Sequence, residues 1–376
     1  MRKAILTALA TLTLLPSAAV PKSLEDDRAD LGTMIDRLFV AYTIGDQPGY
    51  AIGVVNQGKL TFAGGYGMAD IESKTPIGPA TAFNLASLSK QFTAAAIAHQ
   101  IVHEEMSLDD TLASHWEGLP EAFAKVEIGH LVYMTSGLPE YYTLPSPKGG
   151  WASEDAFTVD DAISTVLATE RLEYEPGSRW SYSNINYQLL AEVFADQRKS
   201  SFADAMAAAF FTPMGLERTW VDAPIDKSRD YRATSYNWSD EADRWIVSPR
   251  MSPHYGGSGI FSTLTDLAKW DAALYTDKAF GEPFSAQMLA TRTYDHDKTN
   301  DAFGLVHSSY RGEDTVWYEG GDYGVSTYMV RLPGRDQSVI CLSNIGNGGC
   351  ASKARAVLDI LLNFDRDADF VRDPDQ

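Results

Sequence analysis

The chain has 376 residues, of which 44% are hydrophobic, a composition typical of a globular protein with a sizeable core. Its formal net charge of -20 argues against nucleic acid and anionic lipid as partners, because so acidic a surface repels both. The two cysteines, Cys341 and Cys350, are too few for a disulfide framework and lack the CxxC spacing of a metal site.

The N-terminus has the pattern of a secretory signal. Arg2 and Lys3 form a positive start, an apolar run from Ala4 to Leu15 follows, and Ser17-Ala18-Ala19 offers small residues for cleavage. The apolar run is too short to span a bilayer comfortably. We expect residues 1–19 to be removed, which changes the net charge from -20 to -22 because two basic residues and no acids are lost. The pattern predicts a periplasmic or secreted protein with no stable membrane insertion.

Further along the chain, hydrophobic periodicity predicts the main elements. Helical spacing occurs over residues 31–39, and the alternation over residues 49–67, with a turn at Asn56-Gln57-Gly58, indicates a β-hairpin. From residue 86 to about residue 300 the pattern is mainly helical, with long Pro- and Gly-rich loops. Four strand patterns then precede a last helix and an acidic tail: AFGLVHSSY, TVWYEGG, VSTYMVRLPG and QSVICLSNIG.

This order predicts an α/β (α+β) fold in one domain over residues 20–376. The late strands can join the early hairpin in one antiparallel sheet flanked by helices. That gives an α/β part of about residues 24–85 plus 300–366, and an inserted helical part of about residues 86–299. The boundary between the two parts is a natural place for a cleft, and Ser87 lies there.

Ser87 and Lys90 form a serine-x-x-lysine pattern at a predicted helix start, where one turn brings both side chains to the same face. A serine needs a base to become a nucleophile, and a lysine can serve only when neutral. Lowering its pKa from ~10.4 to about 7 destabilises the charged form by roughly 4–5 kcal/mol. Burial must supply most of that, and the flanking residues are apolar or small. The alternative is an exposed helix-start serine beside a solvated lysine.

A second pattern, Tyr182-Ser183-Asn184, precedes an apolar helix. A tyrosine hydroxyl near the serine can relay a proton to a leaving group, and an asparagine amide can bind a substrate carbonyl or orient the lysine. The alternative is a turn followed by a capped helix, since Ser and Asn favour helix caps.

Five segments resemble the serine β-lactamase-like family, which includes class C β-lactamases, low-molecular-weight penicillin-binding proteins, D-aminopeptidases and related esterases, and the resemblance extends over nearly all the mature chain. The resemblance implies a β-lactamase/transpeptidase-like fold, with Ser87 as the acylated nucleophile, Lys90 as its partner base, Tyr182 as the proton relay and Asn184 lining the substrate site. Whether Lys90 or Tyr182 is the main base stays open. The segments are FNLASLSKQFTAAAIAHQI, LVYMTSGLPEYY, EPGSRWSYSNINYQLL, GGSGIFSTLTDLAKWDAAL and VSTYMVRLPGRDQSVICLSN.

The third motif of that family, Lys-Thr-Gly or His-x-Gly, is altered. The matching positions here are Tyr318, Glu319 and Gly320, so a tyrosine replaces the usual cation and an acid follows it. The backbone N–H groups of Ser87 and Gly321 are the expected oxyanion hole, which needs no particular side chain. Losing a charge-assisted contact costs ~1.5–3 kcal/mol, so we expect carboxylate-bearing substrates to be handled poorly.

We therefore expect a serine hydrolase that needs no metal or cofactor and acts on a small ester, amide or peptide, with esters and amides ranked first. The alternatives are a D-alanyl-D-alanine carboxypeptidase, a class C-type β-lactamase, or a weakly catalytic binding protein that retains the fold.

Weaker signals leave structural alternatives open. His99 and His103 are four residues apart on a helix, yet without a zinc-protease motif they indicate a helix face rather than a metal site. The Gly256–Gly259 run indicates a tight turn. The two cysteines either pair or remain buried thiols. Four loop aromatics either flank the cleft or pack within the fold: Tyr141, Tyr142, Trp151 and Trp180.

Overall fold

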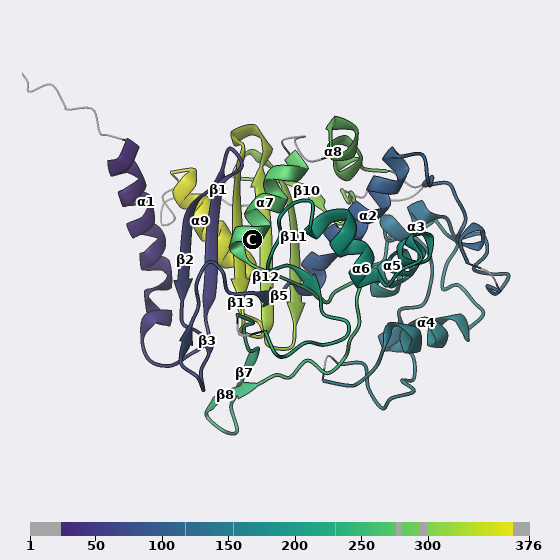
Figure 1. Ribbon diagram of the computed structural model, residues 1–376, viewed down its shortest axis with the longest axis horizontal. Coiled ribbons are helices and arrows are strands. Elements are labelled where there is room, and N and C mark those ends of the chain that lie inside the picture. Colours follow the sequence, from purple (N-terminus) through teal and green to yellow (C-terminus); the bar gives the residue numbers. More distant parts are fainter. Residues whose placement is uncertain are drawn as a thin grey trace, which may run out of the picture.

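The computed structural model describes residues 24–363, apart from residues 117, 153, 230, 276–279 and 293–299. The expected secretory segment, residues 1–19, lies outside the described residues, and its cleavage stays a prediction. Figure 1 shows a central sheet with helices on both faces and a largely helical region beside it.

A six-stranded antiparallel sheet has the strand order β10-β11-β12-β13-β1-β2. The N-terminal hairpin supplies β1 and β2, and the chain after residue 300 supplies the other four strands, with β1 and β13 side by side at the junction. The predicted union of early and late strands is therefore confirmed. The strands are β1 (Tyr50–Asn56), β2 (Lys59–Tyr66), β10 (Val306–Tyr310), β11 (Glu313–Asp322), β12 (Val325–Leu332) and β13 (Gln337–Ser343).

The turn between β1 and β2 follows from its sequence. Asn56 pairs with Lys59, which leaves Gln57 and Gly58 as a two-residue loop with φ values of 51° and 70°. Positive φ at both positions is the geometry of a primed turn, whose twist matches the twist of the flanking strands. The predicted hairpin is thus confirmed at its turn.

Both faces of β1 are buried, because helices cover each side of the sheet. Ile52 and Val54 join the core made with α1 (Leu24–Phe39) and α9 (Cys350–Leu361). Ala51 and Val55 point the other way, into the core that contains the first turns of α7 (Leu264–Tyr275). Helix α7 lies within the range expected for the helical part, yet it packs against the sheet. These two cores hold the sheet rigid behind the site.

Beside the sheet, the chain between residues 86 and 290 is rich in helices but not free of strands. Strand β9 (Ile260–Ser262) pairs with both β5 (Phe83–Asn84) and β6 (Trp220–Val221), and β7 (Tyr236–Ser239) pairs with β8 (Arg244–Val247). The sequence did not predict them, because strands of two to four residues are too short to show a period of two. The helices are α2 (Lys90–Val102), α3 (Ile128–Val132), α4 (Val159–Leu167), α5 (Asn184–Arg198), α6 (Phe202–Met206), a π turn (Ala207–Phe211) and α8 (Glu282–Leu289).

The remaining elements are short strands and single turns. They are β3 (Met68–Asp70), β4 (Thr75–Pro76), β5 (Phe83–Asn84), β6 (Trp220–Val221), β7 (Tyr236–Ser239), β8 (Arg244–Val247), β9 (Ile260–Ser262) and 3-10 turns at Val40–Thr43, Ala86–Ser89, Leu112–Ser114, Tyr141–Thr143 and Pro333–Arg335.

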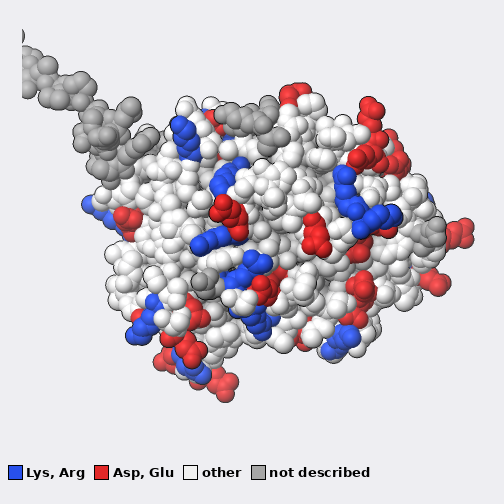
Figure 2. Space-filling view, in the orientation of Figure 1, with Lys and Arg blue, Asp and Glu red and all other residues white. Residues whose placement is uncertain are grey.

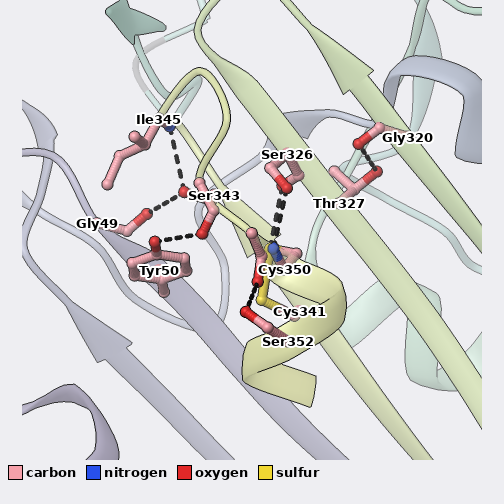
Figure 3. Close-up of a disulfide and its surroundings, with 12 residues drawn as sticks. Gly49, Tyr50, Gly320, Ser326, Thr327, Cys341, Ser343, Ile345, Cys350 and Ser352 are labelled. Atoms are coloured by element: carbon pink, nitrogen blue, oxygen red, sulfur yellow. Dashed lines mark hydrogen bonds between the residues drawn. A yellow bond between two sulfur atoms is a disulfide. The ribbon is translucent and has the colours of Figure 1, made fainter. Parts of the chain in front are cut away.

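Cys341 and Cys350 form a disulfide, which settles the alternative that the sequence left open (Figure 3). Cys341 lies on β13 and Cys350 is the first residue of α9, with their Cα atoms 5.4 Å apart. The backbone N–H of Cys350 also donates to Ser326 Oγ on β12 at 3.0 Å. Because Ser326 stands opposite Gly321 in the β11–β12 ladder, these links support the sheet behind the strand that carries the third motif.

Acidic and basic side chains are interspersed on the face shown in Figure 2, although the chain as a whole is acidic. Within the described residues, no helix has both the length and the apolar character needed to cross a membrane.

Candidate active site

Ser87 follows a constrained turn at the junction of the sheet region and the helices. Strand β5 ends at Asn84, a 3-10 turn spans Ala86–Ser89, and α2 begins at Lys90. Ala86 has a φ of 47°, a region that costs free energy for a residue with a Cβ. The Ala86 N–H donates to Asn84 Oδ1 at 2.9 Å, which holds this conformation. The predicted helix start is confirmed, with the difference that Ser87 lies in the preceding 3-10 turn.

Ser87, Lys90 and Tyr182 form one hydrogen-bonded cluster, as the sequence patterns suggested. Ser87 Oγ lies 2.6 Å from the Tyr182 hydroxyl. Lys90 Nζ lies 3.2 Å from Ser87 Oγ and 2.7 Å from the Tyr182 hydroxyl. The alternative of a solvated lysine is wrong, because the Lys90 side chain is fully buried. The cluster therefore joins a nucleophile to two groups that can move its proton.

Lys90 has two further partners that define its role. Its Nζ donates to Asn184 Oδ1 at 2.7 Å and to the Gly257 carbonyl oxygen at 2.7 Å. Both of these oxygens can only accept, so they occupy two N–H bonds of the amine. A neutral amine then still has a lone pair for a proton from Ser87 or Tyr182. The geometry suits a lysine that takes up a proton.

The electrostatic environment favours the same protonation states. Burial lowers the pKa of Lys90 to about 7, against the opposing influence of Glu140. Burial raises the pKa of Tyr182 to about 12, and the Glu140 and Glu319 carboxylates add to that rise. At neutral pH Lys90 is thus poised to exchange a proton, whereas Tyr182 keeps its own.

Strand β11 passes close to Ser87 and carries the altered third motif. A Cβ atom added at Gly320 would lie 2.3 Å from the Leu85 carbonyl oxygen and 2.9 Å from the Ser87 backbone nitrogen. Only a glycine allows this approach. A Cβ at Gly321 would meet nothing within 4 Å. Among the described residues, the pairing of β10 with β11 ends at Trp317, and after that residue β11 pairs only with β12. Within the described chain, the other edge of β11 is therefore unpaired at Tyr318, Glu319 and Gly321, beside the nucleophile.

Two cavities open beside Ser87, and both are lined by Ser87, Asn184 and Gly321. The larger has a volume of about 460 Å³ and is also lined by Tyr182, Tyr318 and Trp180. The smaller, about 140 Å³, is also lined by Tyr141 and Trp151. Three of the four loop aromatics therefore flank the site, and the exposed Tyr142 instead packs edge-on against Tyr141.

The sequence of most of the chain matches a known family. A family model described as beta-lactamase matches residues 35–362 of the chain.

The chain belongs to the beta-lactamase family.

Sequence relatives in this family carry several names. A D-aminopeptidase of Gluconobacter oxydans is 24% identical over 300 residues, covering 79% of this chain and 56% of the relative. A penicillin-binding protein of Bacillus subtilis is 30% identical over 310 residues, covering 76% of this chain and 66% of the relative. A D-aminopeptidase of Brucella anthropi is 27% identical over 224 residues, covering 60% of this chain and 42% of the relative. The chain thus spans between 42% and 66% of the length of these relatives.

Solved structures in the family share the fold. A penicillin-binding protein homologue from Pyrococcus abyssi gives a TM-score of 0.76 at 23% identity, covering 90% of this chain and 78% of its own. A D-amino acid amidase from Ochrobactrum anthropi gives 0.74 at 20% identity, covering 89% and 99%. At these identities the likeness establishes the β-lactamase/transpeptidase fold.

Glu140 is a residue of this beta-lactamase-family site that the sequence did not indicate. Its carboxylate is buried, and Oε2 accepts the backbone N–H of Asn184, the first residue of α5, at 2.5 Å. Ser183 occupies the cap position of that helix without a capping side-chain bond, so Glu140 takes over the role expected of it. Burial raises the pKa of Glu140 to about 7. No local sequence pattern indicates this residue, because Glu140 lies 44 residues before the helix whose first N–H it accepts.

Gly257 is the second contribution that sequence reasoning missed. The predicted tight turn is present, with φ values of 82° at Gly256 and 85° at Gly259. Thr93 Oγ1 on α2 donates to the Gly256 carbonyl at 2.7 Å, which fixes the loop and directs the next carbonyl to Lys90. The chemistry comes from the backbone, so no side chain marked it.

The remaining candidates lie away from the reacting cluster. His99 and His103 stack with their ring centroids 4.1 Å apart, and His103 Nδ1 lies 2.8 Å from the His99 carbonyl. The part of the chain that the structure describes holds no group of three or more His, Cys, Asp or Glu side chains arranged for a metal.

Proposed function

We propose that the protein hydrolyses esters or amides through an acyl-enzyme formed on Ser87. The observation that carries this proposal is the contact of buried Lys90 with both hydroxyls, at 3.2 Å from Ser87 Oγ and 2.7 Å from Tyr182. In the first step Ser87 Oγ attacks the substrate carbonyl carbon, while its proton passes to Lys90 directly or through Tyr182. The C–O or C–N bond to the leaving group then breaks, and the leaving group takes a proton from Tyr182.

The acyl-enzyme returns to free enzyme by the reverse arrangement. Water attacks the acyl carbon, its proton passes to the same Lys90–Tyr182 pair, and Ser87 leaves with a proton restored. The backbone N–H groups of Ser87 and Gly321 are the proposed donors to the oxyanion, since both residues line both cavities. Lys90 is the proposed main base, because its pKa of about 7 lies far closer to neutral pH than the pKa of about 12 of Tyr182.

The choice of esters and amides over carboxylate-bearing substrates rests on charge. None of the described residues that line the two cavities is Lys or Arg, whereas Asp301 and Glu319 are acidic. A β-lactam or a peptide C-terminus would bring its carboxylate toward these acids without a cation to receive it. The amidase and D-aminopeptidase names of relatives support amide substrates, within the part of their length that this chain covers.

Two measurements test the proposal. A fluorophosphonate probe should add its mass to the protein, and Ser87→Ala should lose that label. Turnover of a short-chain nitrophenyl ester should exceed turnover of a chromogenic cephalosporin. No labelling by either a fluorophosphonate or penicillin would favour a binding protein that retains the fold.

A D,D-carboxypeptidase is the second candidate, favoured by the 30% identity to a penicillin-binding protein. Release of D-alanine from a peptide ending in D-Ala-D-Ala, at a rate above that of the nitrophenyl ester, would place it first.

We also propose that the mature protein is exported. The N-terminal pattern and the Cys341–Cys350 disulfide support this, because disulfides persist in oxidising compartments. N-terminal sequencing of the protein from a periplasmic or culture fraction should begin near residue 20.

A further inference from the structure

We infer that the larger cavity beside Ser87 receives the leaving group and selects leaving groups that carry an ammonium group. This inference deepens the proposed function and rests on it. It names a substrate class: esters or amides of a cationic alcohol or amine, attached to a small acyl group.

The position of Tyr182 assigns the two cavities. Its hydroxyl lies 2.6 Å from Ser87 Oγ and is the proposed proton donor to the leaving group. Tyr182 lines the cavity of about 460 Å³ but does not line the smaller one of about 140 Å³. A leaving group in the larger cavity can accept the Tyr182 proton as its bond to the acyl carbon breaks. The smaller cavity then holds the acyl group.

Aromatic rings form much of the wall of the larger cavity. Their π faces attract a cation within about 6 Å, and tryptophan and tyrosine are the rings that do so best. An ammonium that carries methyl groups also gains from apolar contact, which these rings and their aliphatic neighbours provide. The lining rings are Trp180, Tyr182, Tyr187, Trp317 and Tyr318.

Two carboxylates make the electrostatic potential of the larger cavity negative. Asp301 lies in its wall and accepts a hydrogen bond from the neutral indole N–H of Trp180, so this bond leaves its charge uncompensated. Glu319 lies exposed at the strand edge, next to Tyr318. Among the described lining residues there is no Lys or Arg to oppose them.

The field of Glu319 reaches the reacting Tyr182, and the field of Asp301 reaches two tyrosine rings that line the same cavity. Asp301 helps raise the pKa of Tyr318 and Tyr187, and Glu319 helps raise the pKa of Tyr182. A cation bound between the two acids therefore lies near the hydroxyl that protonates the leaving group. In the reaction the acyl C–O bond of the leaving alcohol breaks, the Ser87 Oγ–acyl bond forms, and the alcohol oxygen takes the Tyr182 proton. The charge on the ammonium nitrogen does not change.

A pair of isosteres tests the charge preference without altering shape. Butyrylcholine and 3,3-dimethylbutyl butyrate share an acyl group and differ only by nitrogen or carbon at one centre. We expect kcat/KM to be at least about tenfold higher for the choline ester. Choline should likewise inhibit hydrolysis of a nitrophenyl ester with a Ki at least about tenfold below that of 3,3-dimethylbutan-1-ol.

Variants locate the preference. Asp301→Asn and Glu319→Gln should each lower the ratio of choline to neutral ester turnover, and the double variant should lower it furthest, leaving only the preference that the aromatic rings supply. Asp314→Asn is the matched control, since Asp314 is exposed on the same strand but does not line the cavity, and it should keep the wild-type ratio. A kcat/KM for the neutral ester equal to or above that for the choline ester would overturn the inference. An unchanged ratio of the two in the double variant would also overturn it.

Labelling and binding measurements distinguish a failure of this inference from a failure of the proposed function. Absence of Ser87 labelling and of any ester turnover would refute the hydrolase. Binding of choline and of its neutral isostere to Ser87→Ala, measured by calorimetry, still decides the charge preference because it needs no turnover. Equal affinities there would overturn the ammonium site.

Discussion

The two sides of the active site are built on different principles. On the helical side, Ser87, Lys90 and Tyr182 are joined by hydrogen bonds of 2.6 to 3.2 Å around a fully buried amine. On the sheet side, the free edge of β11 has tight backbone contacts but side chains that face open cavities. The helical side fixes the chemistry through side chains, and the sheet side fixes position through its backbone while its side chains select the substrate.

The helical side should be intolerant of any change at Lys90. Lys90→Ala removes the group that receives the Ser87 proton, so we expect acylation by a nitrophenyl ester to fall by at least about 1,000-fold. The variant loses the donor to Asn184 Oδ1 and to the Gly257 carbonyl, which should lower its stability, but it should still fold. Rapid-mixing measurement of acylation, beside a thermal melt, separates these effects. Acylation near the wild-type rate would remove Lys90 from the mechanism.

On the sheet side, activity should depend on the position of the β11 backbone, and substitutions at two adjacent glycines test this. Gly320→Ala would force its Cβ to within 2.3 Å of the Leu85 carbonyl, so β11 must move away from Ser87. We expect kcat/KM to fall by about 100-fold, since small misplacements of a site cost that much.

Gly321→Ala is the matched control for that strand. Its Cβ would meet no protein atom within 4 Å and its backbone N–H is retained, although the added methyl group faces the substrate cavities, so the loss of activity should be smaller than for Gly320→Ala and should appear in KM. Equal losses of activity in both variants would show that any added side chain at this edge impairs activity, and that the close approach of β11 to Ser87 is not the cause.

Substitution of side chains on the same strand should change which substrates are preferred while the acyl-transfer reaction is retained. Tyr318→Lys combined with Glu319→Thr creates the Lys-Thr-Gly pattern of other family members. The new cation can bind a carboxylate, so cephalosporin turnover should rise by about ten- to a hundred-fold. Tyr318→Phe combined with Glu319→Thr removes the same acid without adding a cation, and should give a much smaller rise. A similar gain in both double variants would assign the effect to Glu319 alone.

The contrast also explains what the sequence could reveal. Ser87 and Lys90 were predictable because they are three residues apart on one helical turn, and the β1–β2 turn because Gln57-Gly58 suits positive φ. Tyr182 depended on the family resemblance, since 95 residues separate it from Ser87.

The contributions that escaped prediction carry no local pattern. Glu140 acts through its burial against a helix 44 residues away, and Gly257 acts through a backbone carbonyl. The cysteine pairing depended on how β13 and α9 pack, which their spacing of 9 residues does not determine. Long-range packing, rather than composition, set each of these.

The smallest expected effect concerns Glu140, a positioning residue that bridges the cluster to α5. Its charge raises the pKa of Lys90, so its removal should lower that pKa below about 7. Glu140→Gln keeps an oxygen to accept the Asn184 N–H but loses the charge. Because Lys90 must be neutral to act as a base, activity should persist to lower pH. The acid limb of the kcat/KM profile should therefore shift downward by a fraction of a pH unit, on the order of what one partly screened charge gives.

A merely structural role would lower activity at every pH without moving that limb. Glu192→Gln is the matched control, because this half-buried carboxylate on α5 accepts instead from the Tyr255 hydroxyl at 2.5 Å. Its profile should keep the wild-type midpoint. An unchanged or upward-shifted midpoint in Glu140→Gln would show that this carboxylate does not act through the pKa of Lys90.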